Sequence, residues 1–260
     1  MEYDERGVGE RLLLIHGLGG NRASWDTIVD ALAVRRRVLR IDLPGHGASP
    51  AEPDSGTFVG LVDSVERFIA ERRLDGIDVV GSSMGARIAL ELARRGGIGA
   101  VVALDPGGFW QGWERTWFKV TIAASVRLLR LTRPALPALA GNAAIRTVLL
   151  AQLSARPWRL DGSKIATELT SYAATRTFDA LVRDLADGPM QCGPAAGGHV
   201  AIGWGRHDRL CLARQAARAR AAFPSAQLHW FEHSGHFPAW DEPAATVDYI
   251  LGNTGPTTTA

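Results

Sequence analysis

The chain has 260 residues, 46% of them hydrophobic and 22% charged, and a formal net charge of +2. This length and composition are typical of one large or two small globular domains with a substantial core, and the dispersed, nearly balanced charge argues against nucleic-acid binding. Two cysteines outside any zinc-binding spacing, an acidic N-terminus unlike a signal peptide and no apolar stretch fit to span a bilayer lead us to expect a cytoplasmic protein without a membrane partner.

Short apolar runs alternate with helical patterns at the start of the chain. The expected strands are residues 11–15, 37–43, 77–82 and 99–105, and a helix is expected over residues 57–73 and another after residue 83. Continuous apolar strands of this kind are buried on both faces, and strands that alternate with helices form parallel sheets with right-handed crossovers. The pattern predicts an α/β fold with a doubly wound, mostly parallel sheet.

The alternation stops after residue 108, and helical patterns without a convincing strand follow. Helices are expected around residues 135–153 and 163–185, and a Gly/Pro-rich hinge at residues 188–198 leads back to strands at 199–205 and 226–231. We expect a core of residues 1–108 and 194–260 and an all-helical cap of residues 109–193, laid over the strand ends where such sheets bind ligands. A closing helix over 242–251 and a frayed tail from residue 252 complete the chain.

Three tryptophans open the expected cap. Trp110, Trp113 and Trp117 recur at three- and four-residue spacing, so we expect them to share one helix face. Such a stripe serves either core packing or a substrate-binding wall, and both interpretations stay open.

The segment Gly81-Ser82-Ser83-Met84-Gly85 joins an apolar strand to a helix. A serine at the apex of so tight a turn raises its hydroxyl above the sheet, and the flanking glycines allow strand and helix to approach closely. The Met84 N–H then opens the helix and faces any anion that forms at Ser83. The alternative is a Gly-rich turn in which Ser83 only caps the helix.

Two further residues follow strands in the later part of the chain, Asp208 after residues 199–205 and His236 after residues 226–231. The order serine, aspartate, histidine is that of the α/β-hydrolase triad. Four segments stand where that superfamily has them: His16-Gly17-Leu18-Gly19, Asp42-Leu43-Pro44-Gly45-His46-Gly47, Gly81-Ser82-Ser83-Met84-Gly85 and Ser234-Gly235-His236. The sequence therefore resembles the α/β-hydrolase superfamily over nearly its whole length, in the capped branch of esterases, lactonases, haloperoxidase-like proteins and carbon–carbon bond hydrolases.

The resemblance implies a role for each of these residues. Ser83 would be the nucleophile, His236 the general base and acid, and Asp208 the acid that orients the imidazole. The backbone N–H groups of Leu18 and Met84 would hold the oxyanion, with Gly17 beside the substrate. We expect hydrolysis of a small or medium carboxylic ester, thioester or lactone without a cofactor or a metal; the oligomeric state stays open.

Several rival assignments remain at this level. Asp105 also follows a strand and could replace Asp208, and His233 precedes His236 by three residues. A metal cluster of His229, His233 and His236 lacks a supporting carboxylate or cysteine spacing.

Two further functions are possible on the same scaffold. Arg87, four residues after Ser83, echoes a menaquinone-pathway lyase, so the chain could act on a carboxylate-bearing substrate as a lyase or C–C bond hydrolase. A non-catalytic protein that binds a small apolar ligand is the third possibility. The serine at the elbow, where dehalogenases and epoxide hydrolases carry aspartate, argues against alkyl-ester intermediates.

The N-terminus departs from the pattern of the superfamily. Relatives open with a β-hairpin, and Met1–Glu10 is long enough for about half of it. Either the sheet lacks its first antiparallel strand or the natural start lies upstream.

Overall fold

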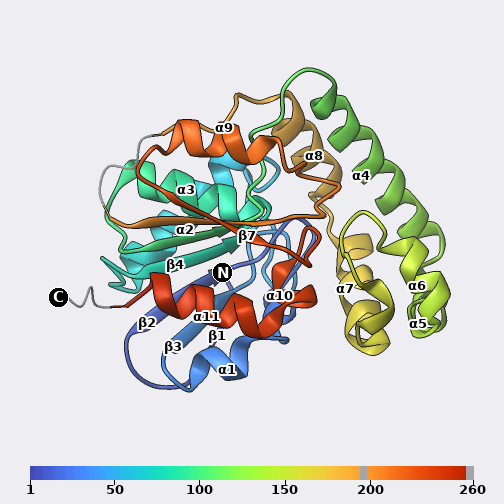
Figure 1. Cartoon of the computed structure of the whole chain (residues 1–260), viewed down its shortest axis with the longest axis horizontal. Coiled ribbons are helices and arrows are strands. Elements are labelled where there is room, and N and C mark those ends of the chain that lie inside the picture. The colour runs from blue at the N-terminus through green and yellow to red at the C-terminus, as the bar shows by residue number, and fades with distance from the viewer. Residues whose placement is uncertain (194–197, 256–260) are drawn as a thin grey trace.

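A central sheet organises the computed structural model, which describes residues 1–193 and 198–255. The sheet has seven strands in the order β1-β3-β2-β4-β5-β6-β7 (Figure 1). The strands are β1 (Tyr3–Arg6), β2 (Arg11–Ile15), β3 (Arg37–Ile41), β4 (Asp78–Ser82), β5 (Val101–Leu104), β6 (Val200–Gly205) and β7 (Gln227–Phe231). All neighbouring pairs are parallel except β1 with β3. The predicted fold class is confirmed.

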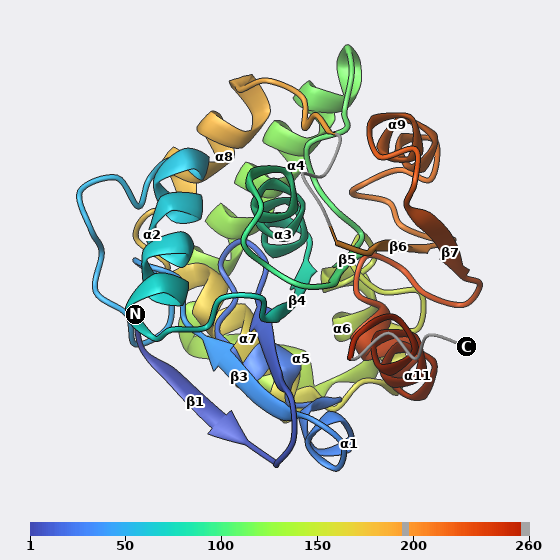
Figure 2. The ribbon, with the colours of Figure 1, turned by 90° about the vertical axis from the view of Figure 1, so that its left-hand side faces the viewer.

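The central strands are apolar because both faces of the sheet are covered. Leu12, Leu13, Leu14 and Ile15 are all fully buried, and their alternating side chains enter two separate cores. The helices on the core of Leu13 and Ile15 are α2 (Phe58–Glu71), α3 (Met84–Arg95) and α9 (Gln215–Ala222). Those on the opposite core are α1 (Val29–Ala33) and α11 (Pro243–Asn253), with the 3₁₀ turn η1 (Arg22–Trp25) and the short α10 (Pro238–Asp241) nearby (Figure 2).

The N-terminal segment forms a single antiparallel strand. β1 pairs with β3 in the register Tyr3 to Ile41, and Arg40 binds the Asp4 carboxylate at 2.8 Å. The first ten residues therefore supply one edge strand, which is the half of the hairpin that their length allows.

An all-helical insertion lies between β5 and β6, at one end of the sheet (Figure 1). It contains α4 (Trp113–Leu131), η2 (Arg133–Ala135), α5 (Leu136–Gly141), α6 (Ala143–Leu149), η3 (Pro157–Arg159), α7 (Gly162–Ala174) and α8 (Phe178–Asp187). The two long helices that we expected over 135–153 and 163–185 are each broken in two. Asn142 breaks the first because its side chain accepts from the Ala144 and Ile145 amides and caps α6. Thr175 ends α7 in an extended conformation, with its hydroxyl directed to backbone carbonyls.

Some expectations concern parts of the chain that the structure leaves undescribed. The division into core and cap stays a prediction. Its second boundary falls at residues 194–197, outside the described residues, as does part of the expected hinge. The prediction of a frayed tail is wrong for residues 252–255, since Arg36 donates to Thr254 and the Gly255 amide donates to Asp78. Residues 256–260 lie outside the described residues. No helix in the described ranges is both long and apolar enough to cross a bilayer.

Candidate active site

Ser83 lies at the turn between β4 and α3, with φ +55° and ψ −113°. A non-glycine residue in this region of φ is strained and marks a functional turn. The glycines around it are required by packing: a Cβ on Gly81 would lie 2.2 Å from the Gly85 carbonyl oxygen, and one on Gly85 would lie 2.2 Å from the Ile15 carbonyl oxygen. The expected strand–turn–helix is present, and it raises the Ser83 side chain at the end of the sheet.

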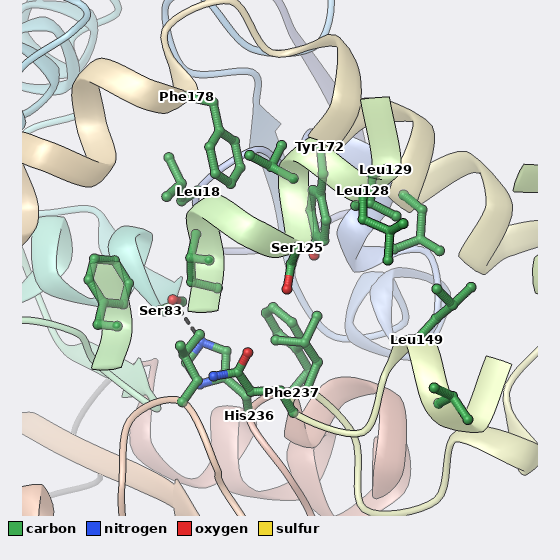
Figure 3. A pocket seen from close by; sticks show the side chains of 18 residues that line it. Leu18, Ser83, Ser125, Leu128, Leu129, Leu149, Tyr172, Phe178, His236 and Phe237 are labelled. Atoms are coloured by element: carbon green, nitrogen blue, oxygen red, sulfur yellow. Dashed lines mark hydrogen bonds between the residues drawn. The ribbon is translucent and has the colours of Figure 1, made fainter. Parts of the chain in front are cut away.

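A continuous hydrogen-bonded chain runs from this serine to two distant residues, and Figure 3 shows its first bond, between Ser83 and His236. His236 Nε2 lies 2.8 Å from Ser83 Oγ, and His236 Nδ1 lies 2.8 Å from Asp208 Oδ2. The other oxygen of Asp208 accepts from the Leu210 and Cys211 amides, which fixes the carboxylate. In the tautomer with its proton on Nδ1, His236 donates to Asp208 and accepts from the Ser83 hydroxyl. The histidine and the aspartate are buried, so water competes little for these bonds.

Asp105 lies next to this chain but differs from Asp208 in its environment. Its Oδ1 accepts from the Gly205 amide at 2.8 Å, while Oδ2 has no hydrogen-bond donor among the described residues. Complete burial and the neighbouring Asp208 raise the pKa of Asp105 well above its ordinary range. This environment favours the protonated form of Asp105, whereas Asp208 is the carboxyl group that contacts the imidazole of His236.

The other histidines lie away from Ser83 or are neutral supports. His229 and His233 are exposed and do not form the metal cluster considered above. In the part of the chain that the structure describes, the potential metal ligands that do converge are Asp208, Cys211 and His236. Two of these are already bonded to each other, and burial raises the pKa of the Cys211 thiol well above its ordinary range, unlike a thiolate ligand.

His16 is a residue that sequence reasoning left without a role. Its Nδ1 lies 2.8 Å from the Gly17 carbonyl oxygen, and its Nε2 accepts from the Leu43 amide at 3.1 Å. Burial lowers the pKa of His16 to about 4, and burial together with His16 lowers the pKa of its neighbour His46 to about 3. Both rings are neutral supports of the loops that follow β2 and β3.

The loop after β2 approaches the serine directly. A Cβ on Gly17 would lie 3.2 Å from the Ser83 Cβ, so Gly17 leaves room for a reacting group. The N–H groups of Leu18 and Met84 donate no hydrogen bond to any described residue. Two unpaired N–H groups beside a serine hydroxyl have the form of an oxyanion hole.

One face of α7 holds this loop. Ser171 Oγ donates to the Gly19 carbonyl at 2.8 Å, and Thr175 Oγ1 lies 3.3 Å from the same oxygen. Ser24 Oγ donates to the buried Glu168 carboxyl at 2.7 Å, and burial raises the pKa of Glu168 to about 7. The sequence analysis did not single out Glu168, Ser171 and Thr175. The available signal was their spacing of three, four and seven residues along the expected helix.

A cavity of about 200 Å³ opens above Ser83 and His236. Its wall is almost entirely apolar and comes from α4, α6, α7 and the loops around the triad (Figure 3). The apolar side chains include Leu18, Phe118, Val126, Leu129, Leu149 and Phe237. Ser125, Gln152 and Tyr172 add polar atoms, and none of the described residues that line the cavity is an aspartate, glutamate, lysine or arginine.

Arg87 and the tryptophans lie outside this cavity. Arg87 is buried behind the elbow, where it donates to the Pro189 carbonyl at 2.7 Å and covers the Phe58 ring at 4.3 Å. Trp110 precedes α4 and stacks on Phe118, whereas Trp113 and Trp117 are exposed. The expected shared helix face of all three tryptophans is wrong, because Trp110 lies in the loop before the helix.

A family model described as the alpha/beta hydrolase family matches residues 12–249. The chain belongs to the alpha/beta hydrolase family. A Mycobacterium tuberculosis protein of unassigned function is 27% identical to this hydrolase over 256 residues, covering 94% of this chain and 75% of that protein. A 2-hydroxy-6-oxononadienedioate/2-hydroxy-6-oxononatrienedioate hydrolase from Cupriavidus pinatubonensis is 26% identical over 269 residues, covering 96% and 90%. A thermophilic esterase from Thermogutta terrifontis superposes with a TM-score of 0.75 at 21% identity, covering 96% and 91%.

Proposed function

We propose that this alpha/beta hydrolase cleaves carboxylic esters, thioesters or lactones with a small or medium apolar acyl group through an acyl-enzyme. The observation that carries the proposal is the hydrogen-bonded chain from Ser83 through His236 to Asp208, which opens into an apolar cavity. A serine hydroxyl is a weak nucleophile unless a positioned base accepts its proton, and this chain supplies such a base.

Each step uses a group already in place. Ser83 Oγ attacks the substrate carbonyl carbon while His236 Nε2 accepts the hydroxyl proton, and Asp208 stabilises the resulting imidazolium. The carbonyl oxygen becomes an oxyanion that accepts from the Leu18 and Met84 N–H groups; one such donor contributes about 2.7–4 kcal/mol. His236 then protonates the leaving alkoxide or thiolate, which leaves an acyl ester on Ser83. Water attacks this ester in the same way and releases the acid.

The alternative of a lyase or C–C bond hydrolase needs recognition of a substrate carboxylate. The relative from Cupriavidus pinatubonensis is named for a dicarboxylate substrate. Arg87, the cation that suggested such a substrate here, is directed to the Pro189 carbonyl and the Phe58 ring, and none of the described residues that line the cavity is an arginine or a lysine. Burying an unpaired carboxylate in an apolar cavity is costly, so the geometry favours a neutral acyl group.

Hydrolysis of p-nitrophenyl butyrate by wild type, Ser83→Ala and Ser82→Ala tests the proposal. Ser82 is the adjacent serine and makes a matched control. We expect Ser83→Ala to lower kcat by a factor on the order of 10⁴ or more while Ser82→Ala stays active. Covalent labelling by a fluorophosphonate should follow the same order. Equal hydrolysis above the uncatalysed rate in all three proteins would refute the catalytic role of Ser83, and the absence of such hydrolysis and of labelling in wild type would favour a non-catalytic binding protein. Preference for a dicarboxylate that depends on Arg87 would favour the lyase or C–C hydrolase instead.

A further inference from the structure

The long helix α4 carries a row of partly exposed apolar side chains. The first two of them also contact the core, since Arg214 covers the Trp113 ring at 4.5 Å and Trp117 Nε1 donates to the Arg209 carbonyl. Trp113, Trp117, Val120, Ala124, Leu128 and Leu131 follow one another at spacings of four, three, four, four and three residues, so they form one stripe along the helix. Val120 is 59% exposed and Leu131 is 83% exposed. The buried residues of the same helix, including Phe118, Val126 and Leu129, lie on the inner side. A helix that is apolar on both sides is unusual at a water-exposed surface.

The exposed stripe continues onto α6 and reaches the mouth of the cavity. Ile145 and Val148 lie three residues apart on α6, and Val148 is 77% exposed. Leu128 and Val148 belong to this surface and also line the cavity above Ser83. Figure 1 shows α4 along the outer edge of the molecule, with α5 and α6 beside its far end. We call this combined surface, the α4 stripe with Ile145 and Val148, the apolar face.

Basic side chains outnumber acidic ones around the apolar face. Residues 115–160 contain eight basic side chains and no aspartate or glutamate, in a chain whose net charge is only +2. The basic residues are Arg115, Lys119, Arg127, Arg130, Arg133, Arg146, Arg156 and Arg159. Lys119 and Arg130 pair with Asp187 and Asp179 of α8, and Arg146 is buried. Arg127 and Arg133 are exposed beside the stripe.

Exposed apolar area and fixed positive charge together select the partner. In a two-fold dimer through this face, the same cationic surface would oppose itself, which like-charge repulsion disfavours. An anionic lipid surface satisfies both features, since large apolar side chains enter the headgroup boundary while arginines bind anionic headgroups. We propose that the apolar face docks on an anionic lipid surface. The expectation of no membrane partner rested on the lack of a spanning segment, and surface docking needs none.

Docking would also orient the active site. Because Leu128 and Val148 belong both to the apolar face and to the cavity wall, a docked protein would have its cavity mouth at the lipid boundary. An apolar ester could then enter without crossing water. This consequence depends on the proposed hydrolase function, whereas the docking itself does not.

Co-sedimentation of the full chain with lipid vesicles tests the docking. The vesicles are phosphatidylcholine alone or an equal mixture of phosphatidylcholine and phosphatidylglycerol, and the protein carries Ser83→Ala so that lipid turnover cannot affect the result. We expect binding to the mixed vesicles, weakened by added salt, and little binding to phosphatidylcholine alone. If the vesicles bind but wild type hydrolyses no ester, the docking stands and the hydrolase proposal fails.

Two pairs of variants locate the binding surface. The double variant Val120→Gln/Leu131→Gln changes the apolar face. Its matched control, Val34→Gln/Val59→Gln, changes two exposed valines outside the helical insertion. Arg127→Gln with Arg133→Gln removes two charges beside the apolar face, and Arg35→Gln with Arg220→Gln removes two exposed charges elsewhere. We expect both double variants of the apolar face and its arginines to bind the mixed vesicles more weakly, by about fivefold for each arginine removed. The two control variants should bind like the Ser83→Ala protein.

Two results would overturn the proposal. One is the absence of binding to mixed vesicles by a protein with an unchanged circular dichroism spectrum, and the other is equal weakening by the control variants. A stable dimer that Leu131→Gln dissociates, in a protein that ignores both vesicles, would assign the face to a second copy of the chain.

Discussion

Replacing Asp105 by asparagine should stabilise the protein by an amount that grows with pH. The carboxyl is fully buried at the end of β5, and burial with the neighbouring Asp208 raises its pKa well above the ordinary range. Asparagine keeps an oxygen that accepts from the Gly205 amide, and it tolerates the left-handed φ of +46° at this position. Its amide also supplies a donor next to the Asp208 carboxylate.

The expected magnitude follows from the protons bound in each state. In the unfolded chain an aspartate ionises near pH 4, whereas burial and the neighbouring Asp208 raise the pKa of the native Asp105 well above that value. The unfolded state therefore binds fewer protons, and this group makes wild type less stable as pH rises from about 4 to its raised native pKa. One such group changes the free energy of unfolding by about 1.4 kcal/mol per pH unit. Asparagine does not titrate, so the stability difference should widen by that slope.

Urea unfolding of both proteins at several pH values between about 5 and 8 measures this slope. Other titrating groups are common to both proteins and cancel in the difference. A difference that stays constant with pH would show that Asp105 is ionised in the native state and would refute the reasoning. The same variant separates the two candidate acids. Asp105→Asn should remain active on p-nitrophenyl butyrate while Asp208→Asn loses about 10⁴-fold in kcat, and the reverse order would make Asp105 the triad acid.

Three further changes concern the loop after β2 and the helix that holds it. Ser171→Ala removes one of two bonds to the Gly19 carbonyl and should lower kcat about fivefold with KM unchanged, and Ser171→Thr should restore it; a change in KM alone would count against loop positioning. The pKa of Glu168 is about 7 in the native protein and 4.5 ordinarily, so wild type should lose about 3 kcal/mol of its free energy of unfolding as the pH rises from about 4.5 to 7. Glu168→Gln should not show this loss, which urea unfolding midpoints measure. Gly17→Ala places a methyl 3.2 Å from the Ser83 Cβ and should slow fluorophosphonate labelling by roughly 10²-fold, whereas unchanged labelling would show that the loop moves aside.

The sheet and the elbow could be predicted from sequence because each depends on local patterns. The continuous apolar run of residues 12–15 requires burial on both faces, and Gly81 and Gly85 allow backbone approaches that any Cβ would block. The boundaries of the predicted core strands agree with the structure to within two residues. The convergence of Ser83, Asp208 and His236 could be predicted from their order along the chain, since each follows a strand and parallel strands end at one edge of the sheet.

The helical insertion was less predictable because its contacts are distant in sequence. Helical spacing shows which residues share a face, but not whether that face turns inward or outward. Trp113 and Trp117 do share a face of α4, yet both are partly exposed beside Arg214 and Arg209, and neither lines the cavity. The role of Glu168 depends on Ser24, which lies 144 positions earlier in the chain. No local pattern contains a contact of that kind.

The distribution of charge separates substrate recognition in the cavity from attraction of the protein to an anionic surface. Near Ser83, burial lowers the pKa values of His16 and His46 and raises the pKa of Asp105, which favours the neutral form of each side chain, and Arg87 is bound to protein groups behind the elbow. A neutral acyl group therefore needs no charged partner in the cavity, whereas a substrate carboxylate would find no free cation among the described residues that line it. Exposed positive charge is also present on the outer surface of the insertion, where Arg127 and Arg133 lie beside the apolar face. If that surface attracts an anionic lipid boundary, the attraction acts on the whole protein, and selection of the scissile bond is left to the shape of the cavity and the two N–H groups beside Ser83.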